Sequence, residues 1–193
     1  MRKVWVIGHV AEDVVLKLRG ELVIGQMHFP TEVIHRCGGS TSNIAIGIAS
    51  GPIETGFITY LGNDDAAEFV EPVLQNSNFN PLLITRGDQG TPRCLVVVDE
   101  FGERTLMLLS KIVKDHGGIT LKHAGIKSGD IVLFTHWNEE WRTEIDYARE
   151  QGCTIVIGIG ALYERKSFKY VLVSGGYWIV SFMIMGGIIC MMK

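Results

Sequence analysis

One short stretch of the sequence has the residue types that suit ligand binding: Cys37-Gly38-Gly39-Ser40-Thr41-Ser42-Asn43, followed directly by the apolar residues 44–49. The paired glycines predict a strand that breaks into a helix. Such a junction leaves backbone N–H groups free at the helix start and lets a small polar ligand approach the chain closely. We therefore expect a ligand site at this junction.

The elements around this stretch alternate between strand-like and helix-like, which predicts an α/β fold built on a mainly parallel sheet. We expect strands at 4–7, 56–61, 82–85, 131–135 and 154–159. We expect helices from the glycine pair to residue 49, after Asp64 or Asp65, and at 139–151. Extended segments at 13–18, 31–36, 94–99 and 105–109, the last two joined by a turn at 100–103, predict a small side sheet.

The composition is that of a folded domain of 193 residues with 47% hydrophobic content. Its 18 basic and 21 acidic residues form no long runs, so we expect a small-molecule or protein partner and no nucleic acid. The cysteines form no C-x-x-C pair, and the amino-terminal apolar run is too short for a signal peptide, which together predict a cytoplasmic protein. The histidines have no metal-ligand spacing, so no metal site is expected.

The glycine-rich stretch at 37–43 and one acidic residue before it resemble the amino-terminal portion of the ribokinase-like (PfkB) carbohydrate kinases. The Gly-Gly-x-x-x-Asn signature of that family matches Gly38, Gly39 and Asn43, and the acidic residue that follows its first strand matches Asp13. The resemblance implies that these four residues bind the substrate. A carboxylate accepts hydrogen bonds from two neighbouring hydroxyl groups, and an amide both donates and accepts, so the pair suits a sugar or a nucleoside.

A structural interpretation of the same residues stays open at this stage. An aspartate after a strand is often a turn former, and an asparagine at a helix start is often a cap.

Further elements follow in the order found in the family. Its Gly-x-Asp-x-x-Gly element matches at Gly62 and Asp64, with Ala67 in the last position, and residues 99–105 look like its hairpin. The resemblance implies a ribokinase-like, three-layer Rossmann-type sheet with a small β-sheet lid, apparently truncated. We expect residues 1–165 to form the substrate-binding portion, with lid segments at about 13–36 and 92–109.

The same resemblance implies ATP-dependent phosphoryl transfer to a sugar hydroxyl, with ATP and Mg²⁺ as cofactors. The family's Gly-Ala-Gly-Asp helix start is not found in this sequence, and Ser128-Gly129-Asp130 precedes a strand instead of opening a helix. We therefore expect no catalytic residue and no nucleotide site in this chain, which would be inactive alone. The alternative function is a non-catalytic sugar- or nucleoside-binding or dimerising module, and exposed lid edges favour a homodimer.

The last residues form an apolar tail of uncertain structure at 166–193, with no charged residue from Val171 to Met192. Three interpretations stay open: a membrane anchor, a buried strand-turn-strand piece of the core, and an aberrant end. Membrane contact by this tail is not the favoured interpretation.

Overall fold

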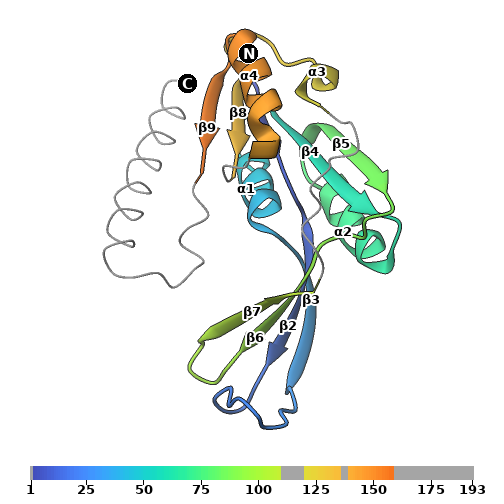
Figure 1. Cartoon of the computed structure of the whole chain (residues 1–193), viewed down its shortest axis with the longest axis vertical. Helices are drawn as coiled ribbons and strands as arrows, with labels where there is room; N and C mark the ends of the chain where they lie inside the picture. Colours follow the sequence, from blue (N-terminus) through green and yellow to red (C-terminus); the bar gives the residue numbers. More distant parts are fainter. Residues whose placement is uncertain (1, 110–119, 136–138, 159–193) are drawn as a thin grey trace.

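A computed structural model describes residues 2–109, 120–135 and 139–158 of the chain. These residues form two β-sheets and the helices that cover the larger sheet (Figure 1). The smaller sheet extends away from the larger one, below it in Figure 1.

The larger sheet has five strands in the order β5-β4-β1-β8-β9, and all neighbouring strands run parallel. Strands β1, β4 and β8 are buried along their whole length, because helices cover both faces of the sheet. The five strands are β1 (Val4–Ile7), β4 (Thr55–Gly62), β5 (Phe79–Gly87), β8 (Ile131–Phe134) and β9 (Thr154–Ile157).

The side chains of β1 divide the core into two halves. Val4 and Val6 pack with helices α1 and α2 on one face, whereas Trp5 and Ile7 pack with α3, η1 and α4 on the other. The result is a three-layer arrangement. The helices are α1 (Ser40–Ala49), α2 (Asp65–Gln75), α3 (Leu121–Ala124), the 3-10 helix η1 (Glu139–Trp141) and α4 (Arg142–Glu150).

The smaller sheet, called the second sheet below, has four strands in the order β3-β2-β6-β7. The outer pairs are antiparallel, and the central pair β2–β6 is parallel. In the turn between β6 and β7, Asp99 Oδ1 accepts hydrogen bonds from the N–H groups of Phe101 and Glu103, both at 2.9 Å. The strands are β2 (Ala11–Lys17), β3 (Glu32–Gly38), β6 (Arg93–Val98) and β7 (Arg104–Leu108).

The predicted architecture, a three-layer α/β sheet with a small second sheet, is confirmed. The strands and helices expected from the sequence are found, with ends shifted by a few residues. Helix α3 was not expected, because four residues are too few to show a helical period. The tail at 166–193 lies outside the described residues. Among the described helices, none has the length and apolar character needed to cross a membrane.

Candidate functional site

The carboxyl group of Asp13 lies directly against Gly38. Both residues belong to the second sheet, Asp13 to β2 and Gly38 to the end of β3. A Cβ atom built on Gly38 would lie 2.1 Å from both Cγ and Oδ2 of Asp13, a separation that real atoms do not reach. Any side chain at residue 38 would therefore displace this carboxylate.

Gly39 and the start of α1 complete the junction expected from the sequence. Gly39 is the N-cap residue of α1 and has a φ of +94°, which glycine adopts without strain. The Ser42 hydroxyl lies 2.5 Å from the carbonyl oxygen of Gly38 and 2.9 Å from that of Gly39. It therefore already has hydrogen-bond acceptors within the junction. The two glycines thus connect the strand that contacts Asp13 to the helix that carries Asn43.

Asn43 lies in the first turn of α1, where its backbone N–H donates to the carbonyl oxygen of Gly39 at 3.1 Å. Its side chain is exposed, and no hydrogen bond joins it to Asp13. The cap of α1 is Gly39, so the interpretation of Asn43 as a helix cap is wrong. Asp13 lies within β2, so its interpretation as a turn former is wrong as well.

The electrostatic surroundings of Asp13 set it apart from an ordinary surface carboxylate. Burial raises the pKa of Asp13 above its usual value. Among the described residues, none donates a hydrogen bond to this carboxylate or forms an ion pair with it. Burial, and secondly the charge of Asp13, raise the pKa of the nearby Cys37 thiol to about 11, so Cys37 stays a neutral thiol at neutral pH.

A buried pair of hydroxyl groups fixes the start of α1 to the larger sheet. Thr41 Oγ1 lies 2.7 Å from Thr135 Oγ1, which follows the carboxyl end of β8. The carboxyl ends of parallel strands are the side on which ligands bind in open α/β sheets. The sequence carried no signal for this pair, because 94 residues separate its members.

Gly62 and Asp64 of the Gly-x-Asp-x-x-Gly element have structural roles. The Gly62 N–H donates to Thr91 Oγ1 at 3.0 Å. Asp64 is the N-cap of α2, and its carboxylate accepts hydrogen bonds from the N–H groups of Ala67 at 2.9 Å and Thr91 at 2.7 Å. The sequence left Asp64 and Asp65 open as the residue before this helix, and the structure shows that the cap is Asp64. Asp65 pairs instead with Arg93, at 3.0 Å.

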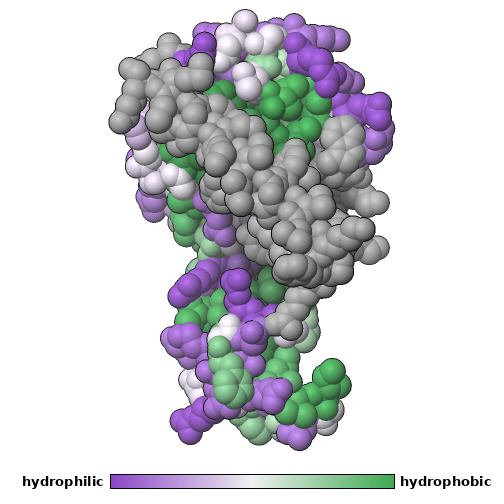
Figure 2. Space-filling view, turned by 90° about the vertical axis from the view of Figure 1, so that its left-hand side faces the viewer, coloured by the Kyte–Doolittle hydropathy of each residue, from purple (hydrophilic) through white to green (hydrophobic). Residues whose placement is uncertain are grey.

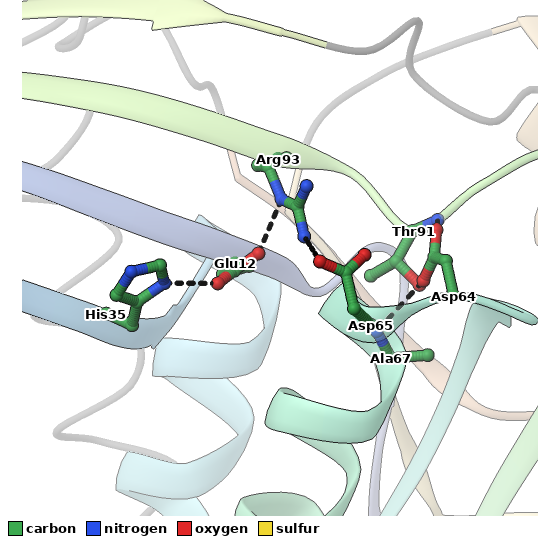
Figure 3. Close-up of polar contacts among 7 residues, drawn as sticks. All are labelled: Glu12, His35, Asp64, Asp65, Ala67, Thr91 and Arg93. Carbon is green, nitrogen blue, oxygen red and sulfur yellow. Dashed lines mark hydrogen bonds and ion pairs between the residues drawn. The ribbon is translucent and has the colours of Figure 1, made fainter.

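A second cluster was not foreseen from the sequence. It surrounds Glu12, whose buried carboxylate contacts His35 and Arg93 (Figure 3). In the described ranges, this cluster included, no three His, Cys, Asp or Glu side chains are grouped so that they would hold a metal ion.

The layered sheet, the second sheet and the glycine junction together match one known family. The profile of the pfkB family carbohydrate kinases matches residues 1–159. The chain belongs to the pfkB family of carbohydrate kinases.

Two curated relatives of this pfkB-family chain are similar over part of their length. An aminoimidazole riboside kinase of Salmonella typhimurium is 30% identical over 111 residues, and a bifunctional ribokinase/ribose-5-phosphate isomerase A of Fructilactobacillus sanfranciscensis is 31% identical over 108 residues.

Solved structures of the same fold include a ribokinase from Thermotoga maritima, with a TM-score of 0.63, and phosphofructokinase-2 from Escherichia coli, with a TM-score of 0.67. Each is 18% identical to the pfkB-family chain and aligns with 81% of it. The chain covers 52% and 54% of those two structures, and 31% and 20% of the two curated relatives. It therefore spans about half the length of the solved structures and less than a third of the curated relatives.

Proposed function

We propose that this chain binds the acceptor alcohol of a sugar or nucleoside kinase, with Asp13, Gly38, Gly39 and Asn43 as the binding residues. The observation that carries the proposal is the Asp13 carboxylate. It is half-buried against Gly38, and no described residue pairs with it. Because its oxygens are not fully buried, the hydroxyl groups of a ligand can take the place of water on this carboxylate.

The chemistry of the acceptor follows from these groups. Two adjacent hydroxyl groups donate to the two oxygens of Asp13, and such charge-assisted bonds are stronger than neutral ones. Asn43 adds an exposed amide one helical turn beyond Gly39, able to donate to a ring oxygen and accept from a hydroxyl. The names of the curated relatives, a riboside kinase and a ribokinase, favour a ribose-like acceptor.

In the complete family fold, the reaction is phosphoryl transfer from ATP with Mg²⁺ to the bound hydroxyl. Within the ranges that the structure describes, no three carboxylate, imidazole or thiol side chains are grouped as ligands for a metal ion. The proposal for this chain therefore concerns the acceptor alcohol alone. Cys37, Cys94 and Cys153 are free thiols, which supports a cytoplasmic location.

The second candidate function is a non-catalytic sugar- or nucleoside-binding module that dimerises through the second sheet. Its support is the apolar surface of that sheet, which includes side chains at least 44% exposed on strands β3 and β7: Val33, Leu106, Met107 and Leu108. Figure 2 shows apolar surface at the lower end of the molecule, where the second sheet lies. Both β3 and β7 are edge strands, which present unpaired backbone groups to a second copy.

Titration calorimetry of the full chain separates the two functions. The titrants are ribose, a riboside and fructose 6-phosphate, each with and without Mg-ATP. Heat with a sugar but none with Mg-ATP, together with a dimer in sedimentation, supports the binding module. Measurable phosphorylation supports the kinase and overturns the expectation that the chain is inactive alone. The absence of heat with every titrant contradicts both.

A further inference from the structure

Glu12 is a nearly buried carboxylate that links three strands. Its side chain is 4% exposed, and its Oε1 and Oε2 each lie 2.5 Å from a nitrogen atom, His35 Nδ1 and Arg93 Nε respectively. These partners belong to β3 and β6, the two neighbours of β2. A carboxylate so far removed from water is stable only with partners of this kind.

The cluster extends from the second sheet to helix α2, as Figure 3 shows. Arg93 Nη2 lies 3.0 Å from Asp65 Oδ2, at the first residue of α2. The His35 ring packs edge-on against Phe69 of the same helix, with 5.9 Å between ring centroids. Through these contacts, Glu12 connects the second sheet to the layered part of the molecule.

Glu12 and Asp13 are consecutive residues of β2, so their side chains lie on opposite faces of the second sheet. Glu12 faces α2, and Asp13 faces away from it, against Gly38. Because both residues share one strand backbone, a movement of β2 relative to β3 also moves the Asp13 carboxylate relative to Gly38.

We infer that Glu12 is a positioning residue, whose hydrogen bond with His35 and ion pair with Arg93 fix β2 and thereby hold Asp13 against Gly38 for the acceptor hydroxyl groups. This inference rests on the proposed function, because it assigns Glu12 to the same site. A purely structural Glu12 would stabilise the fold without influencing the surroundings of Asp13.

Three variants of the full chain test this role. Glu12→Gln keeps the shape of the side chain and weakens its contacts with His35 and Arg93, and Arg93→Met removes the guanidinium group. Glu71→Gln is the control, because it weakens an ion pair between α2 and Arg86 that does not reach the second sheet. The measurements are the Kd for ribose by calorimetry and the pKa of Asp13 by carboxyl NMR, at a temperature where each variant is folded.

We expect the Kd for ribose to rise about tenfold in Glu12→Gln and Arg93→Met and to stay unchanged in Glu71→Gln. In Arg93→Met, we also expect the pKa of Asp13 to fall, because a loosened strand returns the carboxyl group to water. Loss of a positive charge alone would raise that pKa, so the direction of change is decisive.

A pKa of Asp13 that stays the same or rises in Arg93→Met overturns the inference. An unchanged Kd for ribose in both cluster variants overturns it as well. If the wild-type chain binds no sugar, the proposed function fails, and the pKa of Asp13 in Arg93→Met still decides whether Glu12 positions it.

Discussion

The carboxyl group of Asp13 occupies the space that a side chain at Gly38 would need, since a Cβ atom there would lie 2.1 Å from Asp13 Cγ. This contact explains why a glycine stands at the end of β3, next to the glycine that caps α1. A mutation at Gly38 can therefore move the Asp13 carboxyl group while Asp13 itself is kept.

Gly38→Ala is expected to weaken sugar binding at least about tenfold while leaving the chain folded. Gly38 has no positive φ, so alanine adds no backbone strain, and the carboxyl group of Asp13 is the movable side of the clash. Calorimetry with ribose measures the effect, and circular dichroism checks the fold. Affinity equal to that of the wild type would show that the position of Asp13 does not matter for binding.

Asp13→Asn is expected to make the fold slightly more stable at neutral pH. Burial raises the pKa of Asp13, so the folded state holds a proton more tightly than the unfolded state. The ionised carboxylate therefore opposes folding above its ordinary pKa, and this opposition fades as the pH falls through the raised value. Thermal melting from pH 7 downward measures the difference between variant and wild type, which should shrink toward acid pH. A variant less stable than the wild type at pH 7 would contradict this explanation.

Asn43→Ala is expected to weaken sugar binding by about 1 kcal/mol, the contribution of one hydrogen bond, with an unchanged melting temperature. The side chain is exposed and the cap of α1 is Gly39, so the helix does not depend on this amide. Asn78→Ala removes an exposed amide that lies outside the helices and is the control. If both variants bind ribose like the wild type, Asn43 is not part of the site.

Asp64→Ala is expected to destabilise the chain by about 1–2 kcal/mol through loss of the α2 cap. Burial alone would raise the pKa of Asp64, but hydrogen bonds from Thr91 and the Ala67 N–H, with the charge of Arg93, leave it below its ordinary value. Its stabilising effect is therefore complete above the ordinary pKa and is lost as the pH falls through the lowered one. Urea unfolding across this range measures it, with the exposed Asp65→Asn as control; equal effects of the two variants would contradict the capping role.

The sequence predicted those features that depend on local patterns. The paired glycines and the apolar residues after them predicted the strand-helix junction, and Asp64 or Asp65 before an apolar period predicted a cap. The family resemblance added Asp13 and Gly38. The partners of Glu12 were not predictable, because His35 and Arg93 lie 23 and 81 residues away and no local pattern encodes their pairing. Strand register, which brings them together, depends on tertiary packing.

The most direct test of the account compares ribose binding by the wild-type chain and by Asp13→Asn in the same calorimeter, at neutral pH. The account predicts saturable heat for the wild type and a loss of at least about tenfold in affinity for the variant, because an amide replaces one oxygen that accepts hydroxyl hydrogen bonds. Equal binding by the two proteins, or no binding by either to any sugar or nucleoside, would contradict it.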